Sequence, residues 1–247
     1  KSCQHSVMKQ KLNKRNNARI LSGNGLIQGE FPATVPLAMR EESGESADGN
    51  GNSRSPFKVV VLAASEGGLR AFSHILPAFP PDFPAAIIVV QKPDIQSASS
   101  LITDALNRPP TLPLKQAQEG EPLKPGMVYM APANQHLLVT PEGTFCLSGA
   151  VLVDFARPSA DLLLQSLAAS FKERAIAVIL SGSGGDGVSG VQAIKKMGGL
   201  AIAQNESTSE FFEMRRAAIE KGKVDFVLPL DEIGSTLVNL VVSSVLT

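Results

Sequence analysis

The stretch VVVLAASEGGLRAF, residues 59–72, joins an apolar run to a helical pattern through a turn of small residues. A continuous apolar run is typical of a β-strand that is buried on both faces. The small residues that follow let the backbone turn sharply. Ser65 stands at this corner, at the start of the expected helix, where free N–H groups favour negative charge. The segment therefore supports two interpretations of Ser65, an ordinary helix N-cap or a nucleophile on a strand-to-helix elbow.

The same alternation of strand and helix patterns continues to the end of the chain. Apolar runs predict strands at 57–63, 85–91, 175–181 and 200–205, and helical patterns lie between and after them. This order is typical of βαβ units, so we predict an α/β fold with a doubly wound, mostly parallel sheet and helices on both faces. Residues 110–150 contain short strands between Gly/Pro turns, which predict a small β-hairpin insertion at the sheet edge.

The first 56 residues have a different character. They begin with a basic stretch, continue with an acidic segment rich in Gly and Ser, and show no sustained apolar period. We therefore predict a flexible tail and linker at 1–56 and one domain at 57–247. The apolar alternation that a folded domain would need is missing from 1–56.

The composition limits the kinds of partner that we expect. Lys plus Arg and Asp plus Glu both number 23, Trp is absent and there is one Tyr, which argues against a nucleic-acid partner. No apolar run reaches the roughly 18 residues of a membrane span, so we expect no membrane insertion. Two cysteines, Cys3 and Cys146, make a disulfide framework improbable and favour a reducing, cytoplasmic location. We predict neither a metal ion nor a cofactor.

Polar residues follow two other predicted strands, at the sheet edge where α/β proteins bind ligands. Lys92 ends the second strand in VVQKPD, where a lysine is either solvated or part of a site. The loop LSGSGGDGVSG, residues 180–190, fits the G-x-G-x-x-G pattern, with Glu206 about 20 residues further on. Asp186 lies inside that loop and would repel a pyrophosphate. The loop is therefore a dinucleotide site, a site in which Asp186 orients a catalytic base, or a turn in which Asp186 caps the helix.

Few histidines are available as a base for Ser65. His74 is nine residues further along the same expected helix, roughly 13 Å away at 1.5 Å per residue, which is too far. His136, in APANQHLL, lies where a turn enters a strand of the insertion, and we keep it as an alternative base.

Five segments together resemble one family. AASEGG, APANQH, RPSADLLL, ILSGSGGDGVSG and AIAQNESTSEFFEMRRAAI match, in order, blocks of the catalytic domain of CheB-type chemotaxis receptor protein-glutamate methylesterases. The resemblance runs from about Lys58 to the C-terminus. It implies a doubly wound parallel sheet, hydrolysis of methyl esters on receptor glutamates with release of methanol, and deamidation of receptor glutamines. It also implies that the partners are the cytoplasmic helices of methylated chemoreceptors or related signalling proteins.

The resemblance assigns roles to individual residues. Ser65 matches the nucleophile and Asp186 the acid of a Ser-His-Asp triad, and the backbone N–H groups of Glu66 and Ser183 match the oxyanion donors. The sequence departs from the family at the base, where Lys92 replaces the histidine. Glu66 also replaces a threonine, and Arg215 replaces a proline.

The replacement of the base has an energetic consequence. A lysine has a pKa near 10.4, so holding its free base at pH 7 costs roughly 4.6 kcal/mol, and a carboxylate partner adds to this cost. Lysine bases in other hydrolases need a desolvated site. We therefore expect a serine ester hydrolase whose catalysis is impaired. The alternative is a catalytically degenerate binding module of a chemosensory assembly.

Overall fold

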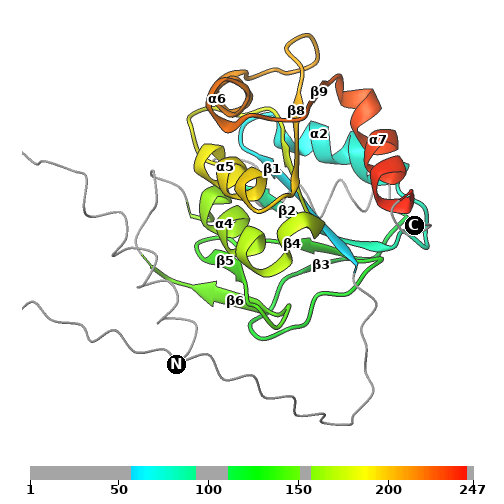
Figure 1. The fold of residues 1–247 in the computed structure, drawn as a ribbon, viewed down its shortest axis with the longest axis vertical. Helices are drawn as coiled ribbons and strands as arrows, with labels where there is room; N and C mark the ends of the chain where they lie inside the picture. Colours follow the sequence, from blue (N-terminus) through cyan, green and yellow to red (C-terminus); the bar gives the residue numbers. More distant parts are fainter. Residues whose placement is uncertain (1–56, 93–110, 151–156, 244–247) are drawn as a thin grey trace, which may run out of the picture. The chain divides into compact units, whose positions relative to one another are not determined.

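The computed structural model describes residues 57–92, 111–150 and 157–243, and its centre is a seven-stranded sheet. The strand order is β3-β4-β2-β1-β7-β8-β9, and every neighbouring pair is parallel (Figure 1). The strands are β1 (Lys58–Ala64), β2 (Ala85–Gln91), β3 (Leu114–Gln116), β4 (Val128–Met130), β7 (Ala175–Ile179), β8 (Leu200–Gln204) and β9 (Phe226–Leu228). The four strands predicted from apolar runs are confirmed as β1, β2, β7 and β8.

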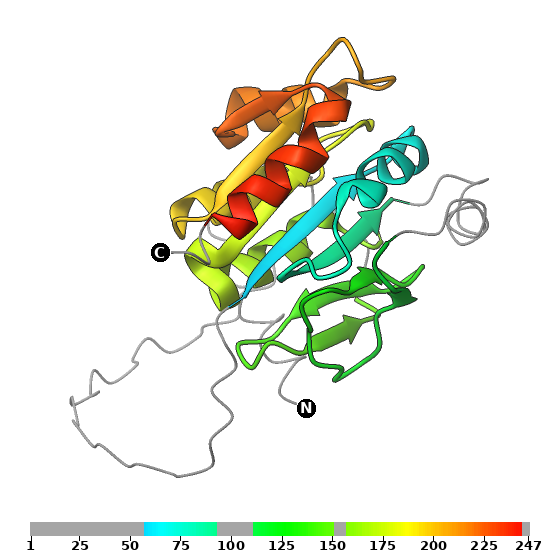
Figure 2. The same ribbon diagram turned by 90° about the vertical axis from the view of Figure 1, so that its right-hand side faces the viewer.

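Helices cover both faces of the sheet, as predicted. They are α2 (Gly68–Ile75), α4 (Ala160–Phe171), α5 (Val188–Lys196), α6 (Glu213–Gly222) and α7 (Leu230–Val242). Figures 1 and 2 show α2 and α7 on one face and α4, α5 and α6 on the other.

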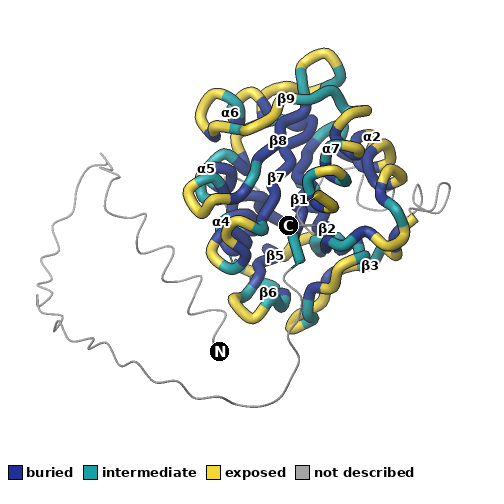
Figure 3. Tube along the Cα trace, turned by 45° about the vertical axis from the view of Figure 1, so that its right-hand side comes forward, coloured by how far each residue is buried: buried dark blue, intermediate teal, exposed yellow. Residues whose placement is uncertain are grey.

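Each face of the sheet contributes to its own apolar core. Val59 and Val61 of β1 pack in the core that includes α4, α5 and α6, whereas Val60 and Leu62 pack in the core with α2 and α7. Side chains alternate across a strand, so a strand between two helical layers needs an unbroken apolar run. Figure 3 shows the buried strands at the centre of the domain, surrounded by exposed helix faces and loops.

The predicted hairpin insertion is only partly correct. β5 (His136–Val139) and β6 (Phe145–Ser148) form an antiparallel hairpin, which packs against α4 through a bond from the Val139 N–H to the Ser166 hydroxyl (3.0 Å). β3 and β4, however, extend the main sheet as parallel strands beside β2. Three-residue strands carry too short a pattern to distinguish parallel extension of a sheet from a separate hairpin.

Some predictions lie outside the described residues. They are the tail at 1–56 and, among the helical patterns expected between the strands, the one at 98–107; both stay predictions. Cys146 is buried on β6, whereas Cys3 lies outside the described ranges. The expectation drawn from the two cysteines stays a prediction. No helix in the described part of the chain has the length and apolar character to cross a membrane.

Candidate active site

Ser65 lies on a tight elbow between β1 and α2. Its N–H donates to the carbonyl of Ser181 (3.1 Å), and its own carbonyl accepts from the Gly68 N–H (3.1 Å). The N-cap of α2 is Gly67, with φ of +77° and no side-chain cap. The N-cap interpretation of Ser65 is therefore wrong. Ser65 is 5% exposed, and within the described ranges its hydroxyl forms no hydrogen bond.

Glycines allow two strand ends to meet at this elbow. A Cβ on Gly182 would lie 2.8 Å from the Cβ and 3.0 Å from the N of Ser65. A Cβ on Gly67 would lie 2.7 Å from the Ser181 hydroxyl. Real Cβ atoms do not approach this closely, so only glycine fits at these two positions. The close approach brings the loop after β7 into contact with the nucleophile position.

The sheet register places Lys92 beside the elbow. Ala64 of β1 pairs with Gln91 of β2, and the Lys92 N–H donates to the Ala64 carbonyl (3.0 Å). Ser65 follows Ala64 and Lys92 follows Gln91, so Ser65 and Lys92 occupy equivalent positions just beyond the ends of two adjacent strands. The Gln91 amide nitrogen also donates to the Ser65 carbonyl (3.4 Å). Lys92 is half-buried, and its ammonium forms no ion pair with any described residue.

Asp186 is buried and forms three hydrogen bonds at the N-terminus of α4. Its carboxylate accepts from the Ser159 hydroxyl (2.9 Å) and from the N–H groups of Ala160 (2.8 Å) and Asp161 (3.0 Å). Burial raises the pKa of Asp186, while these bonds act in the opposite direction. The N-cap of α5 is Gly187, with no side-chain bond, so Asp186 does not cap its own helix as one interpretation held. It caps α4 instead.

The residues matched to the oxyanion donors lie on the two loops that meet at the elbow. In the part of the chain that the structure describes, the N–H groups of Glu66 and Ser183 donate to no protein acceptor. Backbone N–H groups without acceptors, on loops that meet at a serine, are of the kind that an oxyanion requires.

The glycine loop is poorly suited to a pyrophosphate. The Gly184 N–H already donates to the Glu213 carboxylate (3.2 Å), and Asp186 adds a second carboxylate to the loop. Both anions would repel phosphate groups, which argues against the dinucleotide interpretation. Within the described ranges, no group of three or more His, Cys, Asp or Glu side chains could hold a metal ion.

His136 is fully buried in β5, where it pairs with Ser148 across the hairpin. It therefore belongs to the small hairpin and not to the edge where β1, β2 and β7 end. Its role as an alternative base stays a prediction.

Sequence reasoning missed two residues that hold the elbow. The Ser181 N–H donates to the side-chain oxygen of Gln204 (3.0 Å), which is 1% exposed at the end of β8. The Ser181 hydroxyl accepts from the Phe211 N–H (3.0 Å). The one signal available in the sequence is that both Ser181 and Gln204 are polar residues at the ends of apolar strands.

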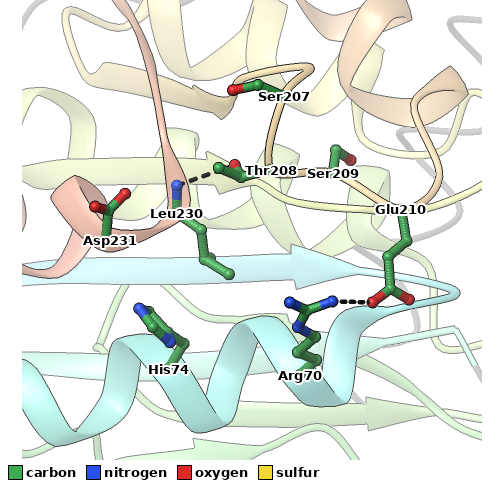
Figure 4. A pocket seen from close by; sticks show the side chains of 8 residues that line it. All are labelled: Arg70, His74, Ser207, Thr208, Ser209, Glu210, Leu230 and Asp231. Atoms are coloured by element: carbon green, nitrogen blue, oxygen red, sulfur yellow. Dashed lines mark hydrogen bonds and ion pairs between the residues drawn. The ribbon is translucent and has the colours of Figure 1, made fainter.

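A cavity of about 510 Å³ lies between α2, the segment that follows β8 and the start of α7 (Figure 4). It is lined by Arg70, His74, Ser207, Thr208, Ser209, Glu210, Leu230 and Asp231. Arg70 and Glu210 form an exposed ion pair (2.5 Å), and the Leu230 N–H donates to the Thr208 hydroxyl (3.1 Å). The predicted catalytic residues do not line this cavity. Its link to them is Glu210, whose carboxylate would lie 3.4 Å from a Cβ on Gly67.

Comparisons with known proteins place the chain in a family. The family model described as CheB methylesterase matches residues 60–237. A putative protein-glutamate methylesterase/protein-glutamine glutaminase of Leptospira interrogans is 38% identical over 184 residues, which cover 74% of this chain and 95% of that protein. A protein-glutamate methylesterase/protein-glutamine glutaminase of Anaeromyxobacter dehalogenans is 44% identical, over 73% of this chain and 52% of that protein. The chain thus spans about half the length of the second relative.

A solved structure supports the fold. The crystal structure of the Thermotoga maritima CheB methylesterase catalytic domain superposes with a TM-score of 0.71 and 38% identity, covering 75% of this chain and 99% of that domain.

Proposed function

Because the chain belongs to the CheB methylesterase family, we propose that it hydrolyses γ-methyl esters on glutamates of a chemoreceptor and deamidates glutamines, at a reduced rate. One observation carries the proposal. Ser65 stands on an elbow against Gly182, and the next residue on each of the two loops, Glu66 and Ser183, has a backbone N–H that donates to no acceptor within the described residues. The named activities of the relatives, protein-glutamate methylesterase and protein-glutamine glutaminase, support the choice of substrate.

The reaction would proceed through an acyl-enzyme. The Ser65 hydroxyl attacks the ester carbonyl carbon, and its proton passes to a base. The N–H groups of Glu66 and Ser183 stabilise the oxyanion as the carbonyl oxygen gains charge. The C–O bond to the methoxy group breaks, and the base returns the proton, so methanol leaves. Water then attacks the acyl-enzyme by the same route, which releases the glutamate and restores the serine.

The reduced rate follows from the residue at the base position. Lys92 directly follows Gln91, the residue of β2 that pairs with Ala64. The resemblance to the family assigns the triad histidine to position 92. A lysine accepts a proton only as its free base, a minor form at neutral pH. Loss of one triad member typically leaves a rate about 10³–10⁴ above the uncatalysed reaction, because oxyanion stabilisation and binding remain.

The proposed substrate also sets the partner and the location. We expect the chain to bind the cytoplasmic helices of a methylated chemoreceptor, or of a related signalling protein, in the cytoplasm, without a cofactor.

A second candidate function is a binding module of a chemosensory assembly. The hydrogen bonds of Asp186 favour it. The three hydrogen-bond donors of this carboxylate within the described residues all belong to the N-terminus of α4, and none is a basic side chain. In that case the acid residue has a structural role, and the fold serves recognition without turnover.

Methanol release separates the two candidates. Incubation of the purified chain with a methylated chemoreceptor cytoplasmic fragment is expected to release methanol slowly, and Ser65→Ala is expected to abolish the release. Binding of the fragment with no methanol above the Ser65→Ala background would reject the esterase and support the binding module.

A further inference from the structure

Two aromatic side chains are exposed beside the elbow. Phe211 is 43% and Phe212 is 47% exposed, on the segment between β8 and α6. Adjacent exposed aromatic residues at the edge of a catalytic site are typical of a surface that another protein covers.

The backbone of this segment is attached to the residues that position Ser65. The Phe211 N–H donates to the Ser181 hydroxyl (3.0 Å), and the Phe211 carbonyl accepts from the Gly182 N–H (3.1 Å). The Ser181 carbonyl in turn accepts from the Ser65 N–H. Gly182 lies so close to Ser65 that any side chain at position 182 would collide with it. The backbone of Phe211 is therefore held beside the elbow, and the ring of the next residue, Phe212, lies 5.9 Å from the Arg215 guanidinium.

The segment continues on its other side into the rim of the cavity. Glu210, directly before Phe211, pairs with Arg70 of α2 (Figure 4). The surface beside the nucleophile thus combines two aromatic side chains with one exposed pair of opposite charges. This combination matches an amphipathic helix, in which apolar and charged side chains lie one turn apart.

We propose that Phe211 and Phe212 are specificity-determining residues that dock an amphipathic helix of the protein substrate, with its esterified glutamate over Ser65. The proposal rests on the proposed function for the nature of the substrate. Residues three or four positions from the glutamate lie on the same face of its helix. Apolar residues at those positions would pack on the aromatic pair while the ester reaches the elbow. Buried aromatic anchors of this kind dominate binding at many interfaces.

The test measures binding, so that it does not depend on turnover. The probe is a fluorescent helical peptide with a central glutamate γ-methyl ester and leucines four residues before and after it. A second peptide carries serines in place of the leucines. The variants are Phe211→Ala and Phe212→Ala, which keep the backbone bonds to the elbow. Phe226→Ala is the matched control, because Phe226 is also an exposed phenylalanine (38%) but lies on β9.

We expect Phe211→Ala and Phe212→Ala each to raise the Kd of the leucine peptide about 10-fold, as expected for loss of an anchor residue. Phe226→Ala is expected to leave the Kd unchanged, and the serine peptide is expected to bind the parent chain as weakly as the leucine peptide binds the variants. Equal Kd values for the parent and both variants, or no binding of the leucine peptide to the parent, would overturn the proposal.

The outcomes for docking and for chemistry are distinguishable. If the parent binds the leucine peptide through Phe211 and Phe212 without releasing methanol, docking stands and the esterase fails. If the parent releases methanol in a Ser65-dependent way, but Phe211→Ala and Phe212→Ala bind the peptide as tightly as the parent does, the esterase stands and docking by the aromatic pair is wrong.

Discussion

Asp186 and Asp161 cap each other's helices: Asp186, which lies just before α5, caps α4, and Asp161, in the first turn of α4, caps α5. The carboxylate of Asp186, one residue before the N-cap of α5, accepts the Asp161 N–H in the first turn of α4 (3.0 Å). The carboxylate of Asp161 accepts the N–H of Gly190 in α5 (2.7 Å). A Cβ on Gly190 would lie 2.6 Å from the Cβ of Leu164, so the two helices are in close contact here. The exchange fixes the orientation of Asp186, whatever its part in catalysis.

Replacement of Asp186 by asparagine tests this structural role. The amide nitrogen would face hydrogen-bond donors at the start of α4, and we expect Asp186→Asn to lower the free energy of unfolding by about 1–3 kcal/mol. Urea denaturation at pH 7 measures the change. A loss below about 0.5 kcal/mol would contradict the described hydrogen bonds.

The same variant tests the pKa of Asp186. Burial raises this pKa in the folded state, so the folded protein binds the proton more tightly than the unfolded chain does. The free energy of unfolding should therefore decrease as pH rises from the ordinary aspartate pKa of about 3.9 through the raised value. Denaturation curves between pH 3 and pH 7 should show this decrease in the free energy of unfolding in the parent and not in Asp186→Asn. Identical pH dependence in both proteins would count against the raised pKa.

Gly182 is required for the close approach of two loops at the nucleophile. Gly182→Ala would place a methyl group 2.8 Å from the Cβ of Ser65 and 2.9 Å from the sulfur of Met214. We expect a loss of about 1–3 kcal/mol in stability from the displacement, together with a loss of esterase activity. Gly185→Ala is the matched control in the same loop, since its Cβ would meet nothing within 4 Å. Equal effects of the two substitutions would show that the elbow is not tightly packed.

Arg215 is a buried cation with incomplete hydrogen bonding. It is 4% exposed, and its Nε has no described acceptor, while its nearest carboxylate is that of Glu206 at 3.8 Å. Replacing a poorly paired buried charge by an apolar side chain is often neutral or stabilising by about 1–4 kcal/mol. We therefore expect Arg215→Met to keep or raise the melting temperature. Arg216→Met, at an exposed site of the same helix, controls for loss of charge, and a clear drop in melting temperature confined to Arg215→Met would refute this account.

The parts of the fold that the sequence predicts are those with long, uniform patterns. β1 and β2 are apolar throughout because both faces are covered, and this pattern is legible without a structure. The pattern at β3 and β4 predicts a hairpin, because three residues do not reveal the direction of the neighbouring strand.

The candidate site shows a similar limit. Strand ends and small residues in the sequence were enough to identify the elbow at Ser65 and the loop at Asp186. The partners of these residues come from distant segments, such as Ser159, which is 27 positions from Asp186, and Phe211, which is 30 positions from Ser181. No local pattern encodes such contacts, so neither the capping of α4 by Asp186 nor the exposed aromatic pair was predictable.

We expect the elbow at Ser65 to remain competent for ester hydrolysis and Lys92 to limit the rate of that reaction. The most direct measurement is kcat/KM for p-nitrophenyl acetate at pH 7 in the parent, Lys92→His and Lys92→His/Ser65→Ala. Lys196→His, at an exposed position on α5, controls for catalysis by a surface imidazole. We expect kcat/KM to rise roughly 10²-fold or more in Lys92→His alone, because general-base catalysis typically contributes about 10²–10⁴-fold. No rise in Lys92→His, or a rise that persists without Ser65, would contradict it.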